Sequence, residues 1–325
     1  MTGTNRTRRS IIVATGSFAV IGYVGTDWLS DTDSTGSDDF TAGTVPDGSD
    51  PLLLIRPRRG RDASITAAVV TSLLAATSLD KTPGLPRDAL DAGRDATDLH
   101  KLAVVGSNGS GESAVVAWAD WSKTELRERV SASISGKPKT DAYEGRTVYL
   151  AGDAAGATLA DGVVTLGTER QVRSVIDVWH ADAAPVDDAV LHPFDRTDRT
   201  APVRFATTGL AFHDDRTGPR TDEYAPVVNT AVDAVVDGTD ATVTITYEVE
   251  SIDATDRLAN AIKRDLGLTP PEGPVEPALP RGIRSDLAVT TDPAVVTVDY
   301  SAAADSVAGY VSDVLTTLAA VTGDQ

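Results

Sequence analysis

The sequence predicts an α+β fold built from duplicated strand-strand-helix units, with antiparallel sheets and helices packed on one face. Three observations predict it. Short β-branched runs recur along the chain, turn signals separate pairs of these runs, and an amphipathic helical pattern follows each pair. Four segments carry the pattern, and four units predict a tandem pair of layered domains. The segments are residues 114–130, 163–179, 243–262 and 295–315.

The first elements of the folded region precede these repeats. A short apolar run at residues 52–55 predicts a strand, and residues 64–79 predict a helix. The helical prediction rests on apolar residues whose spacing places them on one face. These residues are Ile65, Val69, Leu73 and Ala76.

A second strand precedes the strand of each unit, so the sheet is expected to consist of hairpins. The predicted pairs are residues 101–106 with 113–118, 146–151 with 163–167, and 287–291 with 295–299. Turn signals mark the hairpin loops. They are Asn108-Gly109, Asp161-Gly162, Asp237-Gly238 and Asp292-Pro293.

The predicted helices begin at residues that accept hydrogen bonds from unpaired backbone N–H groups. Ser122 with Glu125, and Thr168 with Gln171, have the spacing of capping boxes. Two further helix starts carry simple caps, and these are Asp253 and Ser301.

Composition divides the chain of 325 residues into four regions. Residues 1–30 form a targeting segment or membrane anchor. Residues 31–50 hold six aspartates and no basic residue, which is typical of a disordered tether. We expect a first α+β domain at residues 51–200 and a second at residues 201–325, with a boundary in a loop rich in Asp and Pro.

The first region carries an arginine pair, Arg8 and Arg9, between Thr7 and Ser10, and an uncharged run at residues 11–25 follows. This arrangement resembles the signal of the twin-arginine export route, which carries folded proteins across a membrane. The resemblance implies that the translocation machinery recognises Arg8 and Arg9. As a helix the run would reach only about 22 Å, less than a bilayer core of about 30 Å. Cleavage of this segment and its retention as an anchor both stay open.

The chain has no cysteine, a net charge of −19 and a pI near 4.5. The missing cysteines exclude disulfides and thiolate metal sites, and the acidity argues against nucleic-acid binding. Asp greatly outnumbers Glu, and Arg greatly outnumbers Lys. Such a composition resembles that of exported envelope proteins of extremely halophilic archaea. Concentrated salt would screen the repulsion among the carboxylates.

A glycine-rich segment at residues 106–113 matches a phosphate-binding loop except at one position, where Glu112 replaces the required lysine. A strand is predicted to follow it, whereas a phosphate loop must open a helix. We therefore expect a hairpin tip. Asn108 within it lies in an N-x-S sequon and is a candidate N-glycosylation site.

Other chemistry is not indicated. The aspartates that follow Asp31 imitate the start of a calcium loop, but Ala42 stands where a bidentate Glu is required. The histidines have no metal spacing, although His213 precedes two aspartates. We predict no catalytic residue, cofactor or metal. The histidines are His100, His180, His192 and His213.

Aromatic residues are sparse, and three tryptophans are conceivable as stacking platforms for a ligand. Trp118 and Trp121 lie on or just after a predicted strand, and Trp179 follows apolar residues at helical spacing, which predicts a core position. Only Trp121 is a candidate for exposure.

Together these features predict an extracytoplasmic protein, tethered to the membrane through its N-terminal segment or secreted. We expect a non-enzymatic binding or structural role, with an envelope or surface-layer component as the partner. The alternative is an extracellular hydrolase whose catalytic carboxylate or serine the sequence does not identify. A pocket lined by convergent polar groups would favour the hydrolase.

Overall fold

The structure is a computed structural model of the whole chain. It describes residues 44–56, 61–76, 79–83, 85, 99–107, 112–132, 137–186, 188–210, 221–269 and 279–320. The targeting segment and most of the tether lie outside these residues.

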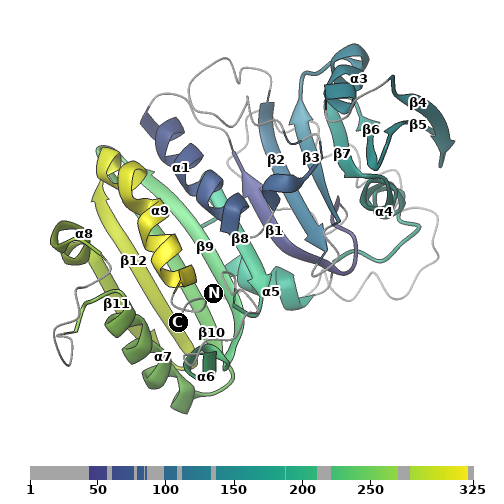
Figure 1. Cartoon of the computed structure of the whole chain (residues 1–325). Coiled ribbons are helices and arrows are strands. Elements are labelled where there is room, and N and C mark those ends of the chain that lie inside the picture. The colour runs from purple at the N-terminus through teal and green to yellow at the C-terminus, as the bar shows by residue number, and fades with distance from the viewer. Residues whose placement is uncertain are drawn as a thin grey trace, which may run out of the picture. The chain divides into compact units, whose positions relative to one another are not determined.

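A single antiparallel sheet of twelve strands dominates the fold, in the order β11-β12-β10-β9-β8-β1-β2-β3-β7-β6-β5-β4 (Figure 1). The strands before residue 200 are β1 (Ser49–Ile55), β2 (Leu99–Ser107), β3 (Ser113–Ala119), β4 (Lys139–Tyr143), β5 (Arg146–Ala151), β6 (Ala154–Ala160) and β7 (Val163–Thr168). The later strands are β8 (Val203–Thr208), β9 (Val227–Asp237), β10 (Asp240–Val249), β11 (Leu287–Asp292) and β12 (Val295–Ala303).

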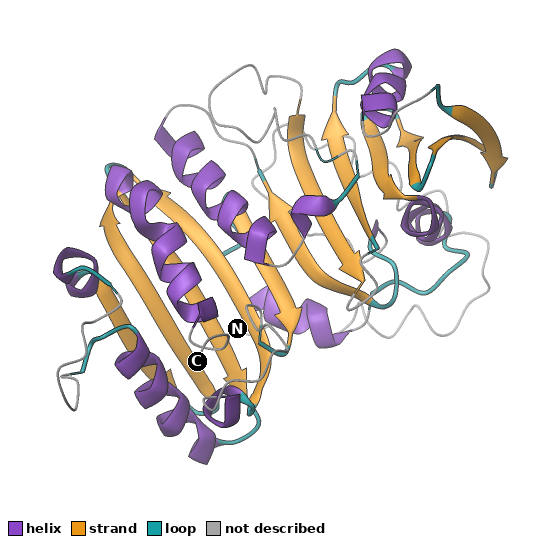
Figure 2. Ribbon diagram, viewed as in Figure 1, coloured by secondary structure: helices purple, strands orange, loops and turns teal. Residues whose placement is uncertain are grey.

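Helices cover both faces of this sheet (Figure 2). The longer ones are α1 (Arg61–Ala76), α3 (Lys123–Ala132), α4 (Glu169–Trp179), α5 (Asp188–Arg196), α7 (Ile252–Asp265) and α9 (Ala304–Ala320). Short turns of helix complete the set, namely η2 (Leu79–Lys81), α6 (Thr221–Tyr224) and α8 (Arg281–Ser285).

The main hydrophobic core lies between the sheet and α1, α3, α7 and α9. Strand alternation selects its residues, because successive side chains point to opposite faces. On β8, Phe205 belongs to this core, whereas the next residue toward the N-terminus, Arg204, donates to the Phe194 carbonyl of α5. Helix α5 therefore packs on the opposite face.

The buried residues of α4 also lie outside the main core. The prediction that all helices pack on one face is therefore wrong. The helical period shows which side of a helix is apolar, but the connecting loops decide which face of the sheet that side meets.

The two predicted domains are joined in one sheet. The predicted boundary at residue 200 falls between α5 and β8, and residues 203–206 of β8 pair with residues 52–55 of β1. Asp50 reinforces this seam, because its buried carboxylate accepts hydrogen bonds from the Thr207 hydroxyl at 2.6 Å and the Thr208 N–H at 3.1 Å.

Strand order is the same on both sides of the seam. The first half runs β1-β2-β3-β7-β6 outward from the centre, and the second runs β8-β9-β10-β12-β11. In both halves a helix follows the third strand, α3 after β3 and α7 after β10. The additional hairpin β4–β5 extends the first half.

The hairpin turns were predicted with more success than the helix caps. The turns at Asp161-Gly162, Asp237-Gly238 and Asp292-Pro293 connect antiparallel neighbours as predicted. The pairing of residues 146–151 with 163–167 is wrong, because β6 lies between these strands. The turn at Asn108-Gly109 lies outside the described residues, although β2 and β3 pair as predicted.

The capping box of Ser122 and Glu125 is confirmed, since each residue's backbone N–H donates to the other's side chain at 2.6 and 3.3 Å. Thr168 precedes α4, but its side chain caps no N–H group. The other two caps are wrong: Asp253 lies inside the first turn of α7, and Ser301 lies within β12.

Candidate interaction surfaces at the two ends of the sheet

The residues to which the sequence assigned a role lie outside the described residues. These are Arg8 and Arg9 of the export signal and Asn108 of the sequon. The aspartates after Asp31 and the pair that follows His213 also lie outside them.

The other three histidines lie apart from one another and contact single partners. His100 is 3.3 Å from Asp120, and His192 is 3.7 Å from Glu248. His180 accepts a hydrogen bond at its Nε2 from Arg146 at 2.9 Å. Within the described part of the chain, no group of three or more His, Asp or Glu side chains is placed to hold a metal ion.

The three tryptophans pack against neighbouring residues more than they face solvent. Trp118 is buried, with the Lys101 ammonium 4.4 Å from its ring centroid. Trp121 packs at the edge of the core beneath the Arg129 guanidinium, 4.0 Å from the ring, and Trp179 is half-buried. None of the helices in the described ranges has the length and hydropathy that a bilayer crossing requires.

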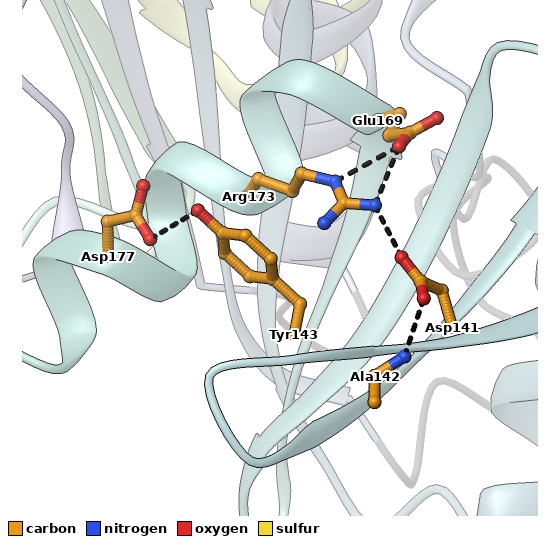
Figure 3. Close-up of polar contacts among 6 residues, drawn as sticks. All are labelled: Asp141, Ala142, Tyr143, Glu169, Arg173 and Asp177. Carbon is orange, nitrogen blue, oxygen red and sulfur yellow. Dashed lines mark hydrogen bonds and ion pairs between the residues drawn. The ribbon is translucent and has the colours of Figure 1, made fainter.

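An ionic network fixes one end of the sheet, where the hairpin β4–β5 meets α4 (Figure 3). Arg173 of α4 donates to Asp141 of β4 at 2.8 Å and, through Nε and Nη2, to Glu169 at 3.0 and 2.8 Å. Its guanidinium lies 4.5 Å from the Tyr143 ring centroid, and the Tyr143 hydroxyl donates to Asp177 at 2.8 Å. The network therefore holds β4, which pairs only with β5 among the described strands, against the helix.

The same network closes the outer edge of β4. Glu144 and Gly145 both have positive φ, as a two-residue type I′ hairpin requires. In this register the N–H of Ala142 points away from β5, and it donates to the Asp141 carboxylate at 2.9 Å. The hydrogen bond from Arg173 is the main reason why the pKa of Asp141 lies below its usual value. The carboxylate thus stays ionised and occupies an N–H group that another strand would need.

We expect the substitution Arg173→Met to loosen the hairpin and leave the rest of the sheet intact. Because the ion pairs are partly exposed, amide hydrogen exchange in β4 and β5 should accelerate only about fivefold. Exchange in β10 should not change. The matched control is Arg170→Met on the same helix, whose arginine is more exposed and pairs with Glu112. Equal acceleration in both variants would contradict the role given to Arg173.

The other end of the sheet presents a polar face that the helices leave uncovered. On the side opposite α7 and α9, alternate residues of β10 and β12 are half-exposed, and those of β11 are exposed. We call this surface the open face. Its residues are Thr242, Thr244, Thr246, Glu248, Ala288, Thr290, Asp292, Val295, Thr297, Asp299 and Ser301.

Hydrogen bonds between neighbouring strands order the open face. Thr244 donates to Asp299 at 2.8 Å, and the hydroxyls of Thr242 and Ser301 are 2.9 Å apart. Where the face meets α5, Glu248 accepts from Asn229 at 2.8 Å and pairs with Arg196. The open face therefore combines hydroxyl and carboxylate groups and contains no basic or aromatic residue.

A buried charged cluster separates the open face from the seam. Arg204 is directly opposite Asp233 in the β8–β9 ladder, and the Asp198 N–H donates to Asp233 at 3.3 Å. Burial raises the pKa of Asp233 to about 6, and it lowers the pKa of Arg204 to about 10. At neutral pH Asp233 is therefore ionised. Its surroundings offset only part of the free-energy cost of burying that charge.

The raised pKa of Asp233 predicts how the free energy of unfolding depends on pH. A carboxyl that is easier to protonate in the folded state binds more protons there, so its contribution to stability falls as the pH rises from about 4 to about 6. The shift to about 6 corresponds to about 3 kcal/mol. We expect Asp233→Asn, compared with the native chain by urea unfolding, to gain about this much relative stability between pH 4 and pH 7. A constant difference across that range would show that Asp233 titrates normally.

Sequence reasoning identified neither the Arg173 network nor the open face. Arg173 was placed on a predicted helix, but its partner Asp141 belongs to a strand that was not predicted. The β-branched run that begins at residue 243 was predicted as a strand. The run itself could not show which polar faces a helix would cover.

Comparison with known proteins gives a likeness of fold. No protein-family model and no curated protein matches the chain. Among solved structures, crystal form III of a protein named TP0453 aligns with a TM-score of 0.50 and 10% identity, over 85% of this chain and 98% of that one. Crystal form IV aligns with a TM-score of 0.47 and 11% identity, over 83% and 96% of the two chains. The first likeness supports a mixed α+β fold with a large antiparallel sheet, and it assigns no activity.

Proposed function

We propose that the protein works outside the cytoplasm as a non-enzymatic binding or structural component of the cell envelope, tethered to the membrane or secreted. The observation that carries the binding role is the open face. An exposed sheet face suits a macromolecule, since a standard interface buries about 800 Å² on each partner. Small substrates instead bind in concave sites.

We further propose that the fold arose by internal duplication. The matching strand orders on the two sides of the seam support this proposal. In a duplicated fold each half can diverge separately, and here the first half ends in the fixed hairpin β4–β5 while the second ends in the open face. The acidic surface is proposed to be an adaptation to concentrated salt, and a melting temperature that does not rise between dilute buffer and about 2 M salt would refute it.

The proposed location is tested with the export signal. The native chain and a variant with Arg8→Lys and Arg9→Lys are expressed in a host that has the twin-arginine route, and the cells are fractionated. We expect the native chain in the membrane or the medium and the variant in the cytosol. Arg6→Lys, in the same segment, serves as the control and should be exported. Export of the double variant would refute the proposal.

The proposed binding surface is tested by cross-linking in intact cells. A photoreactive amino acid replaces Thr297 on the open face or, as the control, Arg257 on the exposed side of α7. We expect a discrete adduct of higher mass from position 297 alone. Adducts from both positions, or from neither, would contradict a binding role for the open face.

A further inference from the structure

We propose that the edge strand β11 binds an extended segment of a basic partner protein, which adds to the sheet as an antiparallel strand. This inference rests on the proposed function, because adding a strand is one way for an envelope protein to bind its partner. In this mode backbone hydrogen bonds supply the affinity, and alternate side chains supply the specificity.

The ladder between β11 and β12 determines which backbone groups are available. The Ser301 N–H donates to the Asp286 carbonyl at 3.0 Å, which makes residues 286 and 301 a hydrogen-bonded pair. Hydrogen-bonded and open pairs alternate along an antiparallel ladder. The N–H and C=O groups of Leu287, Val289 and Thr291 therefore point away from β12, toward the edge.

The register of β11 shows that this edge is regular. Its six residues pair with β12 without a bulge, and β11 contains neither proline nor lysine. Bulges, prolines and lysines usually protect the edge strands of natural proteins. At the opposite edge of the sheet, the Asp141 carboxylate held by Arg173 occupies the outward N–H of Ala142. Among the residues that the structure describes, the sheet thus has a protected edge at β4, whereas β11 carries none of these protecting features.

The two faces of β11 define the side chains that a partner strand needs. Leu287 and Val289 are partly buried against the main core, so the residues opposite them must be apolar. Ala288 and Thr290 belong to the open face, so the residues opposite them are small or carry hydroxyls. The partner must therefore alternate between apolar and hydroxyl residues.

Charge selects the class of partner. Asp286 and Asp292 lie at the two ends of the edge and are both exposed. They share the side of the strand that carries the open face. Opposite charges placed across a strand pair stabilise it, and like charges oppose it. A second copy paired about Val289 would place Asp286 against Asp292 twice, and each chain carries a net charge of −19. A basic segment is therefore the complementary occupant.

The experiment uses the full chain and a labelled peptide, Arg-Val-Thr-Val-Thr-Val-Arg, which matches this edge in length and pattern. We expect saturable binding by fluorescence anisotropy, weakened several-fold by the double substitution Asp286→Asn and Asp292→Asn. A peptide with glutamate at both ends should not bind. Equal binding of both peptides would overturn the charge argument.

Backbone pairing is tested at Val289. Proline is tolerated where the N–H of an edge strand faces solvent, so Val289→Pro should fold while it removes an outward donor. We expect it to weaken peptide binding at least about tenfold, whereas Val289→Ala should weaken it less than about threefold. Equal binding by two folded variants would overturn the inference.

The remaining outcomes separate this inference from the proposed function. Dimerisation of the full chain that Val289→Pro abolishes would make a second copy the occupant, and it would overturn the choice of a basic partner. If the basic peptide fails to bind while position 297 still yields its adduct in cells, the inference fails and the proposed function stands. If the basic peptide binds but position 297 yields no adduct in cells, the binding role proposed for the open face is wrong, and the inference about the edge of β11 stands.

Discussion

Replacing Arg204 with methionine is expected to lower the free energy of unfolding by about 3 to 5 kcal/mol at pH 8. Arg204 is buried, and it donates to the Thr197 hydroxyl and the Phe194 carbonyl, both at 2.7 Å. Its guanidinium also lies 4.1 Å from the Phe194 ring centroid. Methionine would fill much of the space but would leave Asp233 ionised beside it without the cation. The measurement is urea unfolding at fixed salt.

A second substitution tests this explanation. If the uncompensated carboxylate causes most of the loss, Arg204→Met combined with Asp233→Asn should recover more than half of it, because neighbouring changes that share a partner are not additive. Arg204→Lys should recover less, since an ammonium cannot donate to Thr197 and Phe194 in the same fork. A double variant no more stable than Arg204→Met alone would show that the hydrogen bonds to α5 matter more than the charge.

The periodicity of apolar residues predicted those parts of the fold in which one face of an element is buried and the other faces solvent. Residues 240–249 alternate strictly, and they form β10 with its buried side toward the core. Turn residues located three hairpin turns for the same local reason, although the strand predicted to pair with residues 163–167 is wrong. These features depend on neighbours in the sequence, which is why the sequence alone revealed them.

The elements that were missed have weaker local signals. Strand β6, with the sequence AAGATLA, contains one bulky apolar residue and gains its burial from neighbouring strands. Strand β4 is exposed along most of its length, so it shows no alternation. Helix α5 contains Pro193 within a segment rich in Asp, which predicted a loop. Contacts with other elements of the fold help to stabilise all three.

The candidate site depended even more on distant contacts. Asp141 and Arg173 lie 32 positions apart, and β11 owes its importance to its place at the end of the strand order. No motif encodes an edge. The charge of Arg204 also gave no sign of burial, because charged residues are rarely buried unless they are paired.

The substitution Gly167→Ala should destabilise the protein by about 3 kcal/mol or more. A Cβ atom at this position in β7 would lie 2.3 Å from the Ser113 carbonyl oxygen and 2.6 Å from the Ala114 Cα. Both atoms belong to the backbone of β3, the neighbouring strand, so no change of rotamer relieves the contact. The two strands would have to separate near the middle of the first half. Urea unfolding at fixed salt measures the loss.

Two other glycines make the geometric cause testable. A Cβ atom at Gly156 would meet the side chains of Val130 and Leu166 at 2.4 and 2.8 Å. Side chains can move, so Gly156→Ala should cost less than Gly167→Ala. Gly309 in α9 has nothing within 4 Å of its added Cβ atom, and Gly309→Ala should stabilise the helix by about 0.5 to 1 kcal/mol. A loss from Gly167→Ala no larger than the loss from Gly156→Ala would mean that β3 and β7 are not packed as closely as this backbone contact requires.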